Sequence, residues 1–243
     1  MSEQSDQFQT QVHHDGVAEV VLNRPPVNAL NAAGWNALAA EVAALGERPE
    51  VRVIVIRAEG KGFCAGVDIK ELNADQSLII TVNAGNYATF KAVHLNKVPV
   101  IAAVHGFVLG GGIGICGAAD IVIAADDASF GLPEVDRGAM GGAAHLQRMF
   151  GVQKTRYLFF TGEMIGAPEA LRLGAIERVR LASSPERRLR RAHVRARGLH
   201  HLEPDHGRSD DDRDAEHELP ERLELRRLLQ RLHGPDAEEQ HDQ

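Results

Sequence analysis

The stretch "VIAAVHGFVLGGGIGICGAAD", Val100–Asp120, decides how the rest of the chain is interpreted. It begins as an apolar, β-branched run, which is typical of a buried parallel strand, and it continues into a cluster of five glycines. Three of these, Gly112, Gly114 and Gly117, spell G-x-G-x-x-G. Several glycines directly after a strand indicate either a nucleotide-binding turn or a turn whose backbone N–H groups bind another ligand.

The spacing around the glycines argues against a dinucleotide site. That fingerprint needs a βαβ unit of about 30 residues with an acid about 20 residues further on. The helix expected here ends near Ala119, and a crossover normally takes about a dozen residues or more. Asp126 comes too early for the acid, and Glu134 lies beyond the strand, after "FGLP". A Walker loop is excluded because no Lys-Ser/Thr pair follows the glycines.

The glycines are better explained as part of an oxyanion hole. A helix that starts at a glycine turn directs unpaired N–H groups and its positive dipole end toward a ligand. A carbonyl oxygen that gains negative charge, such as that of a thioester, is stabilised there. The segment "FCAGVDIKE", 63–71, is a second glycine turn that opens a short helix. Two such turns can aim donors at one oxygen.

Alternating strand and helix patterns predict an α/β architecture. Apolar β-branched runs predict the strands, at 17–23, 51–60, 98–106 and 121–131. Helical spacing of apolar residues predicts helices at 32–45, after an Asn31 cap, and at 77–95, 140–151 and 152–162. The segment 167–179 predicts a helix followed by a strand.

The composition of the chain limits which classes of binding partner and which compartment we expect. The 243-residue chain has a formal net charge of −7, which favours neither nucleic acid nor an anionic membrane as partner. No apolar run is long enough to span a bilayer, and the polar first residues do not resemble a signal peptide. Two cysteines are too few for a disulfide framework, so we expect a cytoplasmic protein. No His, Cys or Asp spacing suggests a metal site.

The composition changes after residue 180, so we expect a core at 1–180 and an atypical tail at 181–243. The tail has no Lys, Ile, Phe, Tyr, Trp, Met, Asn or Thr, but seven of the twelve His and twelve Arg. One interpretation is a charged, partly disordered tail with a single helix over 220–232. The other is a segment translated out of frame, because a shifted frame of GC-rich DNA yields such a bias.

Three segments resemble the signatures of the crotonase (enoyl-CoA hydratase/isomerase) superfamily. They are "GFCAGVDIKEL", 62–72, "PVIAAVHGFVLGGGIGICGAADIVIA", 99–124, and "ASFGLPEVDRGAMGGAAHLQR", 128–148. The resemblance implies a ββα spiral core, an acyl-CoA substrate whose coenzyme is part of the substrate rather than a separate cofactor, and a trimer or a dimer of trimers. By position it assigns the oxyanion donors to the backbone N–H groups of Val67 and Gly111. It also implies that eight residues bind the substrate and flank its CoA: Ala65, Gly66, Val67, Asp68, Ile69, Lys70, Gly110 and Gly111.

The family resemblance also identifies the catalytic acid. Hydratases of this family use two glutamates, of which the second corresponds to Glu134 and the first falls on Gly114. Adding water across a C=C bond needs one group to activate the water and one to protonate the α-carbon. With a single carboxylate, a proton shuttle such as double-bond isomerisation is the better match. Efficient hydration is in doubt.

Two further residues are candidates with plain structural alternatives. Asp136 is either a second acid or a partner for a loop hydrogen bond or for Arg137. His145 is either an acid–base group or a packed helix residue. For the others we expect structural roles: Asp68 as a helix-start acid, and Cys64 and Cys116 as small buried side chains.

The expected function is therefore isomerisation or hydration of an enoyl-CoA, with Glu134 as acid and base. One alternative is a retro-Claisen C–C hydrolase of a cyclic, steroid-derived ketoacyl-CoA, because the ring-opening hydrolases of the actinobacterial steroid branch have similar glycine segments. Another is a catalytically impaired remnant that binds acyl-CoA.

Overall fold

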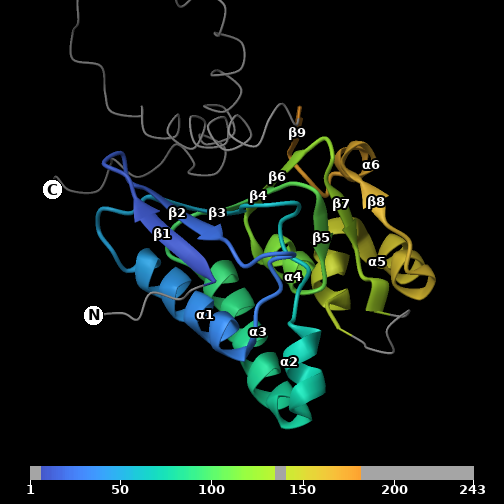
Figure 1. Ribbon diagram of the computed structural model, residues 1–243. Coiled ribbons are helices and arrows are strands. Elements are labelled where there is room, and N and C mark those ends of the chain that lie inside the picture. The colour runs from blue at the N-terminus through green and yellow to red at the C-terminus, as the bar shows by residue number, and fades with distance from the viewer. Residues whose placement is uncertain (1–6, 135–140, 182–243) are drawn as a thin grey trace, which may run out of the picture. The chain divides into compact units, whose positions relative to one another are not determined.

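A six-stranded sheet forms the framework of the computed structural model, which describes residues 7–134 and 141–181 (Figure 1). Its order is β1-β2-β3-β4-β6-β9. All neighbouring strands run parallel except β1, which is antiparallel to β2. The strands are β1 Phe8–Val12, β2 Val17–Leu22, β3 Val53–Ala58, β4 Val100–Val104, β6 Ile121–Ala125 and β9 Arg178–Arg180.

The central strands form because their side chains are buried on both faces. In β3, "VIVIRA", only Arg57 is not fully buried, and β4, "VIAAV", is buried at all but one position. Val20 of β2 lies opposite Ile56, and Ile56 lies opposite Ala102 of β4. Such continuous apolar runs are what a parallel sheet covered on both faces requires, and this agrees with the predicted strands.

A second, smaller sheet corrects one predicted strand. The segment 121–131 is not one strand but two: β6 in the large sheet, and β7, Ser129–Gly131, in a sheet ordered β5-β7-β8. The other members are β5, Phe107–Leu109, and β8, Ile165–Gly166. The chain turns at Asp126 and Asp127, where the Asp127 carboxylate accepts the Gly106 N–H at 3.2 Å. The polar Asp-Asp pair therefore interrupts the apolar run.

The chain repeats a unit of one strand in each sheet followed by a helix. β4, β5 and α4 (Gly111–Ala118) make one unit, and β6, β7 and α5 (Ala143–Thr161) make the next. An isolated parallel bridge between Cys64 and Val108 adds the chain after β3 to the edge of the small sheet. This arrangement confirms the expected ββα spiral.

Two long helices pack together beside the large sheet (Figure 1). They are α1, Ala32–Gly46, and α3, Ile79–His94, with α2, Ile69–Ala74, and the short 3₁₀ helix Gln76–Leu78 between them in sequence. Asn31 caps α1 as predicted, because its side chain accepts the Gly34 N–H at 2.8 Å. The Thr89 hydroxyl donates to the Trp35 carbonyl at 2.9 Å and ties α3 to α1.

The helix α5 contains the break that separates the two predicted helices. Gly151 has φ +71°, a left-handed value, so the helical path is interrupted there. The predicted start at residue 140 is wrong for Gly141 and Gly142, because the helix begins at Ala143 after a left-handed Gly142. The chain continues through α6, Ala167–Arg172, to β9.

Two expectations concern segments that the structure does not describe. The tail interpretation and the helix predicted over 220–232 lie outside the described residues. The same is true of Asp136. Within residues 7–134 and 141–181, no helix is both long and apolar enough to cross a bilayer.

Candidate active site

The predicted donor Val67 lies in a loop, where it forms an isolated parallel bridge with Leu30. The Leu30 N–H donates to the Gly66 carbonyl, and the Asp68 N–H donates to the Leu30 carbonyl, both at 2.9 Å. In such a parallel bridge the residue between the two bonds directs its own N–H the opposite way. The Val67 N–H has no acceptor among the described residues, so it is free for a ligand.

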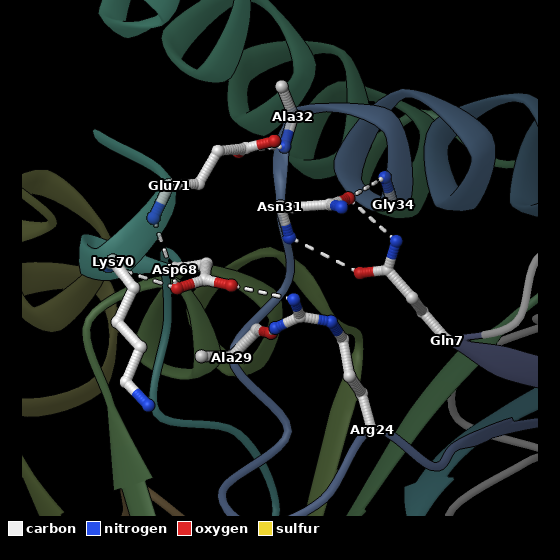
Figure 2. Close-up of polar contacts among 9 residues, drawn as sticks. All are labelled: Gln7, Arg24, Ala29, Asn31, Ala32, Gly34, Asp68, Lys70 and Glu71. Carbon is white, nitrogen blue, oxygen red and sulfur yellow. Dashed lines mark hydrogen bonds and ion pairs between the residues drawn. The ribbon is translucent and has the colours of Figure 1, made fainter. Parts of the chain in front are cut away.

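An ion pair anchors this loop, as Figure 2 shows. Arg24 Nη2 lies 2.6 Å from Asp68 Oδ2, and Arg24 Nη1 donates to the Ala29 carbonyl. The other Asp68 oxygen caps α2 by accepting the Lys70 N–H at 3.0 Å. Burial opposes ionisation of Asp68, but the Arg24 charge and these hydrogen bonds outweigh it and lower the pKa of its carboxyl. Asp68 is thus the helix-start acid that the sequence predicts.

A second set of contacts in Figure 2 holds the starts of α1 and α2 together. Glu71 Oε2 accepts the Ala32 N–H at 2.8 Å. Gln7 donates to Asn31 Oδ1 at 2.6 Å and accepts the Asn31 N–H at 3.2 Å. The Val67 loop is therefore supported by Gln7, directly before β1, and by the starts of α1 and α2.

The two glycine turns lie against each other with no side chain between them. A Cβ on Gly66 would lie 2.8 Å from the Gly111 nitrogen, and a Cβ on Gly112 would lie 2.6 Å from the Cys64 carbonyl oxygen. Both distances are shorter than real side chains tolerate. Gly66 and Gly110 also have the positive φ values of +95° and +49°. The Gly111 N–H, at the start of α4, has no acceptor among the described residues.

The carboxyl of Glu134 lies at this junction. Its Oε1 is 3.1 Å from the position that a Cβ on Gly110 would take. Its Oε2 is buried and has no hydrogen-bond partner in the described part of the chain. Burial raises the pKa of this carboxyl above its ordinary value. The structure thus brings Glu134 to the glycine turns, as the family resemblance implies.

Three glycines of α4, one of them Gly111, form a packing face that the sequence analysis did not predict. Gly111, Gly114 and Gly117 recur every three residues, and a Cβ on any of them would strike a neighbour. The neighbours are the Trp35 ring for Gly111, the Phe90 ring for Gly114 and the His145 backbone for Gly117. The signal was present in the three-residue spacing, which places small residues on one side of a helix.

His145 lies in the first turn of α5, and its ring packs edge-on against Phe90 with centroids 4.6 Å apart. Its Nδ1 is buried and has no partner among the described residues. Burial, with the charges of Arg148 and His94, lowers the pKa of the imidazole. Burial therefore favours the neutral form of His145, and the Phe90 ring that it contacts is the one that lies against Gly114.

The other predicted residues differ in exposure. Ala65, Val67 and Asp68 are half-buried, whereas Ile69 and Lys70 are exposed, so this segment runs from the glycine junction to the surface. Cys64 and Cys116 are free and buried as expected, and burial raises the pKa of the Cys64 thiol to about 12. Over 7–134 and 141–181, no group of three or more metal-binding side chains occurs.

Comparison with known proteins agrees with this geometry. The family model for enoyl-CoA hydratase/isomerase matches residues 13–212. A "(7aS)-7a-methyl-1,5-dioxo-2,3,5,6,7,7a-hexahydro-1H-indene-carboxyl-CoA hydrolase" of Rhodococcus jostii is 46% identical over 68% of this chain and 65% of its own length. A probable enoyl-CoA hydratase of Mycobacterium bovis is 39% identical over 67% of this chain and 65% of its own length. The chain thus spans about two thirds of the length of the relatives it matches.

Solved structures give the same result for the fold. An enoyl-CoA hydratase of Mycobacterium smegmatis superposes with a TM-score of 0.73 and 28% identity, over 80% of this chain and 77% of the other. A Geobacillus kaustophilus enoyl-CoA hydratase subunit superposes with a TM-score of 0.71 and 31% identity, over 81% and 76%. With the matching family model, the two glycine turns and the spiral of strands and helices, the chain belongs to the enoyl-CoA hydratase/isomerase family, the crotonase superfamily.

Proposed function

We propose that this protein binds acyl-CoA thioesters and stabilises a thioester enolate in an oxyanion hole. The donors are the N–H groups of Val67 and Gly111, and Glu134 moves the proton. The observation that carries the proposal is the junction itself. Two backbone N–H groups that have no acceptor within 7–134 and 141–181 lie on turns that touch, and the Glu134 carboxyl, with its buried Oε2, lies beside them. Such preorganised donors act where negative charge develops.

The reaction we favour is hydrolytic ring opening of a cyclic 3-oxoacyl-CoA. The bond that breaks joins the ring ketone carbon to the α-carbon of the thioester. Two relatives, 46% and 45% identical, are named as indene-carboxyl-CoA hydrolases, whereas the probable enoyl-CoA hydratase of Mycobacterium bovis is 39% identical. Gly114, where hydratases of the family have their first glutamate, also provides no second carboxylate. Both observations favour the ring-opening alternative over hydration.

The step balances with water as the only co-reactant. The ionised Glu134 carboxylate takes a proton from a water molecule while the oxygen of that water attacks the ketone carbon of the ring. The tetrahedral adduct collapses to a carboxylic acid and breaks the bond to the α-carbon, and that electron pair passes into the thioester enolate. The N–H groups of Val67 and Gly111 hold the enolate oxygen, and Glu134 returns its proton to the α-carbon.

Isomerisation of an enoyl-CoA is the second candidate. It needs one carboxylate that removes a proton and returns it to another carbon. Glu134 is half-buried, and burial raises its pKa, which suits such a shuttle. The same enolate would be held by the same two donors. Hydration is disfavoured for the reason given above.

We also propose that the protein acts in the cytoplasm as a trimer or a dimer of trimers. Both cysteines are free and buried, which suits a reducing compartment. The oligomer follows from the resemblance of the glycine segments to those of the family.

A panel of CoA thioesters tests these reactions. Each is incubated with the protein in H₂¹⁸O, and the products are analysed by mass spectrometry and NMR. Ring opening places ¹⁸O in a new carboxylate, hydration places it in an alcohol, and isomerisation leaves the mass unchanged. We expect ¹⁸O in a carboxylate from a cyclic 3-oxoacyl-CoA, and none with Glu134→Gln. Tight thioester binding with no product from any substrate would leave only the impaired, acyl-CoA-binding alternative.

A further inference from the structure

The space beside Gly114 is filled by an aromatic ring from another helix. A Cβ on Gly114 would lie 2.7 Å from Phe90 Cε2 and closer still to Cζ and Cε1. Real Cβ atoms essentially never approach other atoms this closely. Any side chain at position 114 therefore has to displace the Phe90 ring.

Phe90 is held in place from both sides. Its ring packs edge-on against Trp35, with centroids 5.9 Å apart, and against His145, with centroids 4.6 Å apart. Trp35 in turn covers Gly111, whose N–H is one of the two free donors. The ring of Phe90 thus lies one helical turn from the donor, within a row of three aromatic rings along α4.

We infer that Phe90 determines the reaction specificity of this site, because its ring closes position 114 to a second acid–base carboxylate. The inference rests on the proposed thioester chemistry. Hydration forms a C–O bond at the β-carbon and a C–H bond at the α-carbon, so one group accepts the proton of water while another protonates carbon. With Phe90 in place of a second carboxylate, the site keeps the enolate chemistry and loses the partner that hydration needs.

Catalysis by paired variants tests this inference. The substrate is crotonyl-CoA, and hydration is followed by the loss of its conjugated thioester absorbance. We expect the double variant Phe90→Ala/Gly114→Glu to hydrate at least about tenfold faster than the wild type, or than either single variant, since a positioned general base contributes about 10²–10⁴ in rate. The matched control is Phe159→Ala/Gly114→Glu, because Phe159 is half-buried in α5 and pairs with Phe160 instead.

Two outcomes would overturn the inference. In one, Gly114→Glu alone, or the Phe159 control, hydrates as fast as the double variant, so the ring does not close the position. In the other, the folded double variant hydrates no faster than the wild type. Ring opening of a cyclic 3-oxoacyl-CoA by the wild type is measured separately, so failure of the proposed function is distinguished from failure of the Phe90 assignment.

A second measurement needs no substrate and no buried carboxylate. Alanine favours a helix interior over glycine, so Gly114→Ala should raise the melting temperature if the space beside it is open. We expect it to lower the melting temperature in the wild type and to raise it in the Phe90→Ala background. A rise in both backgrounds would show that the ring does not occupy this space, and would refute the inference independently of catalysis.

Discussion

Arg24 Nη2 and Asp68 Oδ2 lie 2.6 Å apart and join the chain after β2 to the turn that presents the Val67 N–H. The two side chains are 31% and 15% exposed, so solvent screens this pair less than a surface pair. The loop 63–68 contains no helix or strand, and this ion pair helps to hold it in place together with the bridges from Val67 to Leu30 and from Cys64 to Val108.

Asp68→Asn should reduce both stability and turnover. Asparagine caps a helix as well as aspartate does, so α2 keeps its start while the charge that pairs with Arg24 is lost. Hydrogen bonds to charged groups contribute about 1.5–3 kcal/mol, and we expect a loss of that order in urea denaturation. The control is Arg48→Gln, which breaks an ion pair with Glu50 whose side chains are about half exposed and should cost little. Equal losses in the two variants would show that the Arg24 pair is an ordinary surface contact.

The oxyanion role of Gly111 can be separated from its packing role. Gly111→Ala and Gly111→Pro both place a Cβ against the Trp35 ring, but only proline deletes the N–H. Proline is otherwise tolerated at the first position of a helix. We expect Gly111→Pro to turn over about 10²–10³ more slowly than Gly111→Ala, the usual cost of losing one oxyanion donor. Similar steady-state rates for the two variants would remove Gly111 from this role.

Glu134→Gln should abolish turnover and keep thioester binding. The amide has the shape of the carboxyl but cannot accept and return the proton. We expect the dissociation constant of a saturated acyl-CoA, measured by calorimetry, to stay within about threefold of the wild type, a change below 1 kcal/mol. A variant that retained most of its activity would refute the single-glutamate mechanism.

The raised pKa of Glu134 predicts a pH-dependent cost in stability. In the unfolded chain this carboxyl ionises near pH 4.5, whereas in the folded protein it ionises at higher pH. Below both values it is protonated in both states and costs nothing. As the pH rises above 4.5 the unfolded state is favoured by ionisation. Glu134→Gln should therefore be more stable than the wild type at pH 7 and equal to it near pH 4, as measured by the urea midpoint.

The lowered pKa of His145 predicts the loss of stability on the acid side. The unfolded imidazole takes up a proton near pH 6.5, while the folded one resists protonation to lower pH. At pH 8 both are neutral and the group has no effect. As the pH falls through 6.5, proton uptake favours the unfolded state. A His145→Gln variant should lose less stability than the wild type between pH 8 and 5, and parallel stability curves would contradict this burial effect.

Local chemistry along the sequence was enough to predict most elements and the centre of the site. The buried strands followed from β-branched runs, and the Asn31 cap followed from a side-chain acceptor placed before a helical pattern. The glycine turns at 66 and 110–112 followed from backbone that has no Cβ to block a neighbour. The position of Glu134 followed from resemblance to the family rather than from any local rule.

Tertiary structure decided what depends on contacts between distant residues. The edge strand β1, "FQTQV", alternates buried and exposed positions and forms because β2 pairs with it. The split of residues 121–131 between two sheets depends on Gly106, whose N–H the Asp127 side chain accepts. Above all, the sequence showed that position 114 lacks a carboxylate, but not that Phe90, 24 residues earlier on another helix, fills its place. No periodicity specifies which ring lies over which glycine, because packing across the core sets that contact.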